Sequence, residues 1–192
     1  MRTPCLLAIL LLATSCAARL ATAPRREAIA SSETLARYFP LAIGNRWTWQ
    51  VRTGNRVERA TVRIVDRKRG FFVDDAGGAL AFDGEGLRDE RRYLVLGPLE
   101  PGRTWQSLLE DGTTERYRIA AVGARVAVPA GTFDEVVVVR GTTPVDPRTE
   151  LEIEWAWAPD VGLIRMASEL VAADGERIPQ RTMELLSFER AE

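Results

Sequence analysis

The segment Leu151-Glu152-Ile153-Glu154-Trp155-Ala156-Trp157 carries the clearest structural signal in the chain. Its large apolar residues occupy every second position, and glutamates alternate with them in the first half. Successive side chains of a β-strand point to opposite faces, so this order produces one apolar face and one charged face. A strand with one buried and one wet face is typical of an antiparallel sheet. The segment therefore predicts an antiparallel strand.

The same two-residue period extends from Gly44 almost to the C-terminus. Turn signals interrupt it, for example at residues 128–131 and 159–162, where Pro and Gly suit type I turns between neighbouring antiparallel strands. Residues 32–39 instead predict one or two helical turns that end at Pro40. We therefore expect a mainly β fold, a single curved antiparallel sheet (half-barrel or open barrel) with one short N-terminal helix. Further strands are expected at residues 47–51, 59–67, 70–73, 79–82, 92–96, 104–109, 115–122, 133–140, 163–171 and 181–188.

Residues 133–140 differ from the other strand candidates because four consecutive valines replace the alternation. Such a continuous apolar run is typical of a central strand that is covered on both faces. We expect the short helix near residues 34–39 to provide part of that cover.

Two segments at a constant offset repeat one pattern. Pro40-Leu41-x-x-Gly44-x-x-Trp47, followed by Gly54, recurs as Pro98-Leu99-x-x-Gly102-x-x-Trp105, followed by Gly112. Proline fixes a bend, glycine permits a sharp turn into a strand, and an indole can cover the end of a core. The pattern is either a structural repeat or two independent uses of one way to begin a strand. In both cases Trp47 and Trp105 are expected to be largely buried.

The N-terminus has the layout of a bacterial lipoprotein leader. Arg2 precedes an apolar run, and Ala13-Thr14-Ser15 leads into Cys16. The run is too short to span a bilayer as a stable helix. We expect residues 1–15 to be a signal peptide, Cys16 to be the lipidated mature N-terminus, residues 16–32 to form a flexible tether, and residues 33–192 to form a single antiparallel β domain. The alternatives are a plain secretory leader cut near Ala18 and an uncleaved anchor.

This leader predicts a cell-envelope protein that is anchored to the membrane through its N-terminal lipid. Because Ala17 follows the cysteine, the outer membrane, facing the periplasm, is the expected site in a Gram-negative source. The formal net charge of −1 provides no basic excess for nucleic acid, so no nucleic-acid partner is expected. The only cysteines, Cys5 and Cys16, both lie at the leader, so the exported domain must fold without disulfides.

Residue types that commonly perform catalysis are scarce. The chain has no histidine, which removes Ser-His and Cys-His pairs and the commonest metal ligand. Asp74-Asp75 and Asp83-Gly84-Glu85 bring carboxylates together, but both lie beside glycine as hairpin turns do. We therefore expect no catalytic residue, no metal site and no cofactor. A carboxylate-dependent envelope hydrolase remains the alternative of the enzyme class.

The tryptophans provide the candidate binding residues. Trp47 with Trp49, and Trp155 with Trp157, form two indole pairs, each on one face of a strand. The second pair continues an apolar ridge that begins at Leu151 and Ile153. Such a ridge can line a groove for an acyl chain or an apolar peptide, or it can simply fill the core. A continuous apolar cavity would favour ligand binding, and a filled core would favour contact with an envelope protein.

Taken as a set, four motifs resemble a group of exported bacterial proteins labelled TapB-like. They are Tyr38-Phe39-Pro40-Leu41-x-x-Gly44-Asn45-x-Trp47-Thr48-Trp49, Pro98-Leu99-x-x-Gly102-x-x-Trp105, Val128-Pro129-Ala130-Gly131-Thr132-Phe133 and Trp157-Ala158-Pro159-x-Val161-Gly162-Leu163-Ile164-Arg165. The resemblance implies a mostly antiparallel, curved sheet and carries over no catalytic residue.

These observations lead to one functional hypothesis with alternatives. We expect a membrane-anchored envelope lipoprotein that acts as a non-catalytic binding or protein-interaction module. A half-barrel carrier that holds a lipid or acyl chain on its concave face is the alternative within the binding class.

Overall fold

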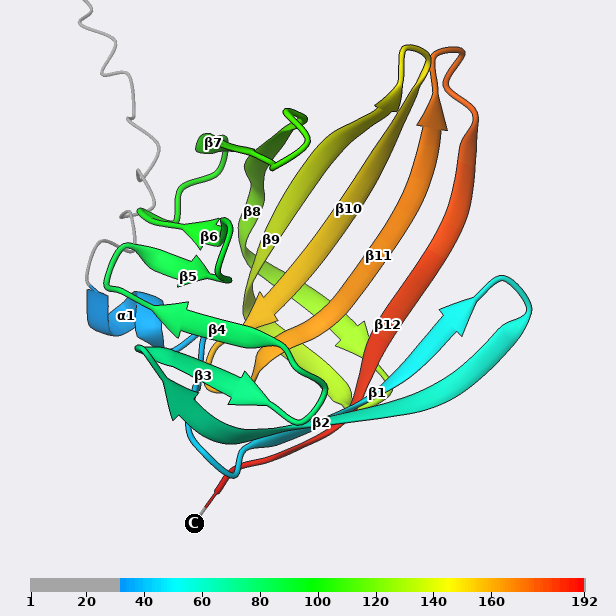
Figure 1. The fold of residues 1–192 in the computed structure, drawn as a ribbon. Coiled ribbons are helices and arrows are strands. Elements are labelled where there is room, and N and C mark those ends of the chain that lie inside the picture. The colour runs from blue at the N-terminus through cyan, green and yellow to red at the C-terminus, as the bar shows by residue number, and fades with distance from the viewer. Residues whose placement is uncertain (1–31, 192) are drawn as a thin grey trace, which may run out of the picture.

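The computed structural model describes residues 32–191, and within this range twelve β-strands form one antiparallel sheet after a short helix (Figure 1). The sheet curves strongly, so the predicted fold class is confirmed. The elements are α1 (Ser32–Ala36), β1 (Arg46–Thr53), β2 (Arg56–Lys68), β3 (Phe71–Asp74), β4 (Ala79–Phe82), β5 (Gly86–Arg88), β6 (Tyr93–Leu96), β7 (Thr104–Leu108), β8 (Thr114–Val128), β9 (Gly131–Asp146), β10 (Thr149–Ala158), β11 (Gly162–Ala172) and β12 (Arg177–Glu189).

The strand order makes the sheet a nearly closed barrel. Strands β1 to β6 form one meander and β7 to β12 form another, and β1 pairs with β12 to join them. The free edges are therefore β6 and β7, which are neighbours in sequence but do not pair in the sheet. The long strands β9 to β12 form the tall wall of Figure 1, and the short strands β3 to β6 lie opposite its lower part.

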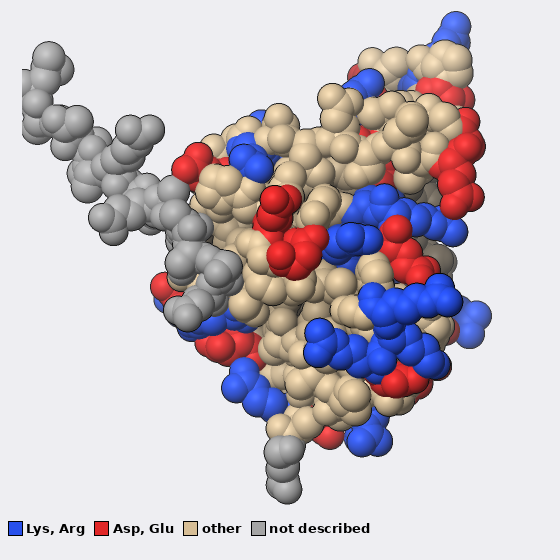
Figure 2. Space-filling view, turned by 60° about the vertical axis from the view of Figure 1, so that its left-hand side comes forward, with Lys and Arg blue, Asp and Glu red and all other residues tan. Residues whose placement is uncertain are grey.

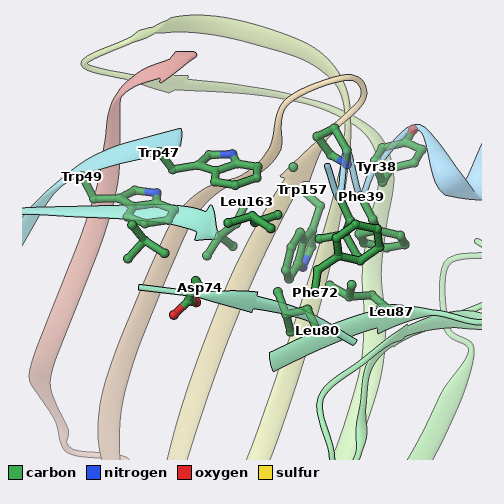
Figure 3. Close-up of a pocket in the computed structure, with 15 residues that line it drawn as sticks. Tyr38, Phe39, Trp47, Trp49, Phe72, Asp74, Leu80, Leu87, Trp157 and Leu163 are labelled. Atoms are coloured by element: carbon green, nitrogen blue, oxygen red, sulfur yellow. The ribbon is translucent and has the colours of Figure 1, made fainter. Parts of the chain in front are cut away.

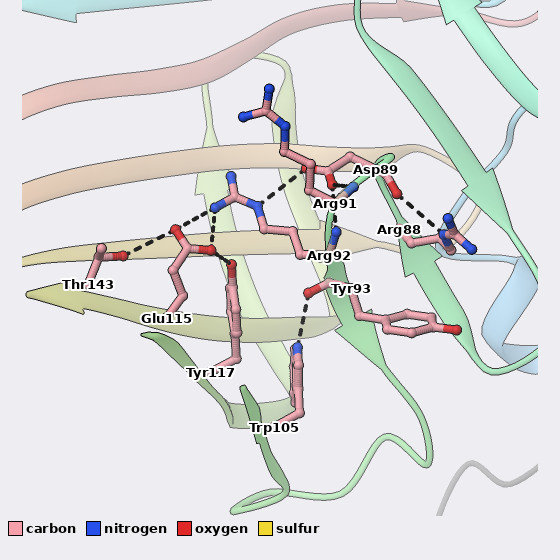
Figure 4. Close-up of polar contacts among 9 residues, drawn as sticks. All are labelled: Arg88, Asp89, Arg91, Arg92, Tyr93, Trp105, Glu115, Tyr117 and Thr143. Atoms are coloured by element: carbon pink, nitrogen blue, oxygen red, sulfur yellow. Dashed lines mark hydrogen bonds and ion pairs between the residues drawn. The ribbon is translucent and has the colours of Figure 1, made fainter. Parts of the chain in front are cut away.

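Side chains bridge the seam between these two edges (Figure 4). The Trp105 indole on β7 donates a hydrogen bond of 3.0 Å to the carbonyl oxygen of Tyr93 on β6. Beside it, the Arg92 guanidinium binds the carboxylate of Glu115, which also accepts hydrogen bonds from Tyr117 and Thr143. Glu115 is 6% exposed, so this ion pair is largely shielded from water.

Both copies of the repeated sequence pattern make the same backbone hydrogen bonds around their glycine, although the peptide bond before Pro98 is cis and the one before Pro40 is trans. The Gly44 N–H donates to the Ile64 carbonyl at 2.8 Å, and the Ile64 N–H donates to the Asn45 carbonyl at 3.0 Å. In the second copy, the Gly102 N–H donates to the Ile119 carbonyl at 2.8 Å, and the Ile119 N–H donates to the Arg103 carbonyl at 2.9 Å. The two glycines have φ values of 99° and 91°, which explains why this position requires glycine.

The two tryptophans of this pattern differ in how deeply the structure buries them. Trp47 is 7% exposed and stacks on Phe188 with ring centroids 5.1 Å apart. Trp105 is only partly buried, because it stands on the edge strand β7 with the ring of Tyr117 on one side. Trp105 is therefore less completely buried than Trp47, since an edge strand has a neighbour on one side only.

The short helix and the segment after it belong to the core. Helix α1 ends at Ala36, and Leu35, Tyr38 and Phe39 are buried in one apolar cluster with Val137 and Val139 of β9. Strand β9 is covered on its other face as well, where Val136 packs in a second cluster. The four valines are thus covered on both faces, as their sequence predicts, whereas Asp134, Glu135 and Arg140 of the same segment are exposed.

Several expectations fall beyond the described part of the chain. The signal peptide, the Cys16 lipidation site and the tether up to residue 31 all lie outside residues 32–191. Within those residues, no helix is long and apolar enough to cross a membrane.

Candidate functional site

An apolar cavity of about 110 Å³ lies between the segment after α1, the β1–β2 hairpin, the short strands β3 to β5 and the β10–β11 hairpin (Figure 3). Several of its walls come from parts of the chain that are distant in sequence. The lining residues are Tyr38, Phe39, Pro40, Leu41, Trp47, Trp49, Val62, Ile64, Phe72, Asp74, Leu80, Leu87, Trp157, Gly162 and Leu163.

Three of the six residues predicted to form a ligand groove meet at this cavity. They are Trp47 and Trp49 of β1 and Trp157 of β10. Trp155 instead packs against Tyr117, with ring centroids 6.1 Å apart. Leu151 and Ile153 are half-buried further along β10 and are not among the lining residues. The predicted ridge therefore contributes one end to the cavity rather than its whole length.

Other lining residues were missed from the sequence. The short strands contribute Phe72, Leu80 and Leu87, and the segment after the helix contributes Tyr38 and Phe39. Strands of three or four residues are too short to show a clear period, so their inward side chains could not be assigned. The adjacent aromatic residues Tyr38 and Phe39 are the one available signal, but their sequence predicts a continuation of the helix, which ends at Ala36.

The three indoles at the cavity differ in hydrogen bonding. Trp47 donates from Nε1 to the carbonyl oxygen of Val161 at 2.7 Å. The Nε1 atoms of Trp49 and Trp157 are buried and have no hydrogen-bond partner. The Trp157 and Phe39 rings meet edge to face at a centroid distance of 5.5 Å. The face of an aromatic ring is only a weak hydrogen-bond acceptor for an N–H group. Two buried polar hydrogens thus lack an oxygen or nitrogen acceptor, which is uncommon in proteins.

The remaining polar groups at the cavity already have partners. Tyr38 donates its hydroxyl hydrogen to the Glu135 carbonyl at 2.7 Å, and burial, with the nearby Glu135 carboxylate, raises the pKa of this phenol. Asp74 Oδ1 accepts the N–H groups of Ala76 and Gly78, at 2.9 and 2.7 Å, within a tight turn. Among the residues that the structure describes, Asp74 is the only carboxylate that lines the cavity, and no second carboxylate stands beside it there for acid–base catalysis.

One ion pair fixes the segment that forms the aromatic wall. Arg37 binds Asp160 Oδ2 with 2.7 Å between Nη2 and the oxygen, and the Asp160 N–H donates to the Arg37 carbonyl. The hydrogen bond from Arg37 holds the pKa of Asp160 below its ordinary value. The contact joins the end of α1 to the β10–β11 turn, directly beside the lining residues Tyr38 and Gly162.

The described residues also form a larger, polar cleft at the surface. Basic and acidic side chains are intermixed on the face shown in Figure 2. A cleft of about 590 Å³ is lined by Arg116, Arg118, Arg140 and Arg177 together with Glu152 and five other residues. Three of these arginines form ion pairs. Arg116 pairs with Glu150 at 3.6 Å, Arg140 with Glu154 at 2.9 Å and Arg177 with Glu152 at 2.8 Å. Most of the positive charge is thus balanced locally.

Comparisons with known proteins identify no family. No protein-family model matches the chain, and no curated protein matches it. Two crystal structures show a weak likeness in fold. One, described as an exported protein with a YmcC-like fold from Bacteroides fragilis, has a TM-score of 0.43 and 14% identity over 79% of this chain and 98% of its own. The other, described as a lipoprotein from Parabacteroides distasonis, has a TM-score of 0.41 and 11% identity over the same shares of the two chains. Neither likeness is close enough to support a functional argument.

Proposed function

We propose that the protein is an envelope lipoprotein whose β domain binds an acyl chain without catalysing a reaction. The observation that carries the proposal is the apolar cavity of about 110 Å³, lined by three tryptophans. Apolar cavities of about 150 Å³ bind molecules of the size of benzene, so this volume suits part of an acyl chain. The membrane anchor is part of the proposal and follows from the leader that ends at Cys16.

An apolar row beyond the cavity favours a long ligand over a compact one. Ile153 and Leu151 continue the same strand face as Trp157, and Leu151 pairs across the sheet with Leu170, which pairs with Ile178. Leu151 and Leu170 are half-buried, and Ile178 is 47% exposed. A chain that enters the cavity can therefore extend along apolar side chains rather than into water.

A titration tests this proposal. The mature chain, residues 16–192 made without the leader, is titrated with dioctanoyl phosphatidylcholine below its critical micelle concentration. Calorimetry and tryptophan emission report binding. We expect saturable heat and a saturable change in emission, because Trp47, Trp49 and Trp157 line the cavity.

A pair of variants locates the binding. Leu163→Phe adds volume to a residue that lines the cavity, whereas Leu108→Phe changes a residue that is 73% exposed on β7. We expect the first variant to weaken binding at least tenfold and the second to leave it unchanged. Absence of binding by the unchanged chain, or equal binding by both folded variants, would contradict the proposal. The protein-contact hypothesis would then be the better account.

A further inference from the structure

We propose that the open edge of β7 binds an extended, acidic segment of a partner protein as an added β-strand. This surface is separate from the apolar cavity, because none of the residues that line the cavity belongs to β6 or β7. The inference goes beyond acyl-chain binding and does not depend on it.

The first argument is that backbone groups along β7 lack a strand partner. The carbonyl of Arg103 accepts a backbone N–H of β8 at 2.9 Å, and the N–H of Leu109 donates to a carbonyl just before β8 at 2.8 Å. Bonded and non-bonded residue pairs alternate along an antiparallel ladder, so the odd-numbered residues of β7 bond to β8. Gln106 and Leu108 consequently direct their N–H and C=O groups to the other side, where the sheet ends.

A cleft of about 290 Å³ lies beside this edge, in the seam between β6 and β7. The indole of Trp105 bridges the seam to the carbonyl of Tyr93 next to the cleft (Figure 4). Leu108 is 73% exposed, so the β7 side of the cleft is open to solvent. An extended segment placed there can pair with β7, as peptides do when they add to a sheet edge. The lining residues are Arg88, Glu90, Arg91, Arg92, Tyr93, Gln106, Ser107 and Leu108.

The seam side of the cleft has an excess of positive charge. Arg88, Arg91 and Arg92 line it with one carboxylate, that of Glu90. Arg92 is occupied by its two ion pairs, and Arg88 lies over the ring of Phe71 at 5.0 Å. Arg91 is exposed and forms no ion pair within residues 32–191. This side of the cleft therefore has a cation available for an acidic side chain.

The exposed face of β8 adds two further arginines. Arg116 lies directly opposite Gln106, and Arg118 lies directly opposite Thr104. Arg116 has an exposed ion pair with Glu150 at 3.6 Å, whereas Arg118 has none in the described part of the chain. Residues of an added strand that lie opposite Gln106 and Thr104 share their face, one strand away from both arginines. Carboxylates at those positions are attracted by this charge.

The same charge argues against a second copy of this chain as the occupant. Two β7 edges that paired with each other would bring Arg91, Arg116 and Arg118 of one copy toward the same residues of the other. Like charges on neighbouring strands are destabilising, and charged side chains protect many sheet edges from self-association. An acidic segment meets the opposite charge, so the edge favours an acidic partner.

The test begins with peptides and the unchanged protein. The mature chain, residues 16–192, is titrated into a fluorescein-labelled heptapeptide that alternates glutamate and valine, and fluorescence anisotropy reports binding. A second peptide has lysine in place of each glutamate. We expect the glutamate peptide to bind about tenfold more tightly at low salt, and we expect salt to reduce this difference.

Two N-methylated forms of the glutamate peptide separate strand pairing from charge. A residue that lies opposite Gln106 shares its face and also exchanges backbone hydrogen bonds with it. Methyl groups on the glutamate nitrogens therefore block pairing with β7, whereas methyl groups on the valine nitrogens point away from β7. We expect the first form to bind about tenfold more weakly than the unmethylated peptide, and the second to lose less than about threefold.

Variants of the chain locate the binding. Gln106→Pro removes an edge N–H group but leaves the hydrogen bonds to β8, and Gln106→Ala retains that N–H group. We expect the first to weaken binding about tenfold and the second to change it less than about twofold. Arg91→Gln combined with Arg118→Gln should remove most of the preference for glutamate over lysine. Arg52→Gln, which changes an exposed arginine of β1, should leave that preference unchanged. Circular dichroism verifies that each variant is folded.

Several outcomes would overturn this inference. They are no binding of the glutamate peptide, equal binding of the glutamate and lysine peptides, or a loss from methylated glutamates no greater than that from methylated valines. A mature chain that elutes as a dimer, and that Gln106→Pro converts to a monomer, would assign the edge to self-association instead. None of these results bears on the acyl-chain titration, which reports on a different site.

Discussion

At the scale of single residues, Trp47 and Trp105 separate local geometry from burial. Each follows a left-handed glycine by three positions, and each donates its indole hydrogen to a backbone carbonyl. Trp47 lies in the middle of the sheet and is 7% exposed, whereas Trp105 stands on an edge strand and is partly buried. The same sequence pattern therefore contributes different amounts of stability at its two positions.

This difference leads to a prediction for the stability of two variants. We expect Trp47→Ala to lower the free energy of unfolding by about 3 to 5 kcal/mol, because it empties a buried site. Trp105→Ala should lower it by about 1 to 2 kcal/mol, because less surface leaves water at that position. Urea unfolding followed by circular dichroism measures both values. An equal or larger loss in Trp105→Ala would show that the edge position is as important to the core as the central one.

At the scale of elements, the barrel is held at its open seam by side chains instead of strand pairing. The Arg92–Glu115 ion pair bridges the β6 edge to β8, and Glu115 is almost fully buried. Burial, together with the hydrogen bond to Glu115, raises the pKa of Tyr117. Tyr117 therefore remains a neutral hydrogen-bond donor to that carboxylate over the physiological pH range.

Loss of the carboxylate should open this seam. We expect Glu115→Ala to lower the free energy of unfolding by about 2 to 4 kcal/mol, because Arg92 and the Tyr117 hydroxyl lose their shared acceptor and Arg92 keeps only Asp89, at 3.3 Å. Glu150→Ala is the matched control, since it removes an exposed ion pair with Arg116 and should cost about 0 to 1 kcal/mol. Thermal and urea unfolding provide the comparison. If the two variants lose equal stability, the ion pair does not hold the seam.

At the scale of the whole molecule, the prediction concerns the anchor. We expect Cys16 to be the acylated N-terminus of the mature protein, so that Cys16→Ser abolishes processing and moves the protein out of the membrane fraction. Mass spectrometry of the N-terminal peptide and fractionation of cells measure both effects. An unmodified N-terminus at Ala17 or later would instead indicate an ordinary secretory leader.

The sequence by itself determined most of the strands and the class of the fold. Alternation and turn residues are local signals, which is why residues 79–82 were placed without error and residues 104–109 to within one residue. Strand β5 was missed because three residues cannot show a period. Strands β8 and β9 extend well beyond their predicted ends, since several β-bulges interrupt the alternation along their pairing.

Only the tertiary structure decided which tryptophans form the cavity. Trp49 and Trp157 are more than a hundred residues apart, and they meet because β1 pairs with β12 and the sheet closes almost into a barrel. Trp155 belongs to the same strand face as Trp157 but packs on Tyr117 instead. The alternation of a strand determines which residues share a face, whereas the register of twelve strands and the curvature of the sheet determine which of them meet. The same long-range pairing provides an acceptor for the indole of Trp47 and none for those of Trp49 and Trp157.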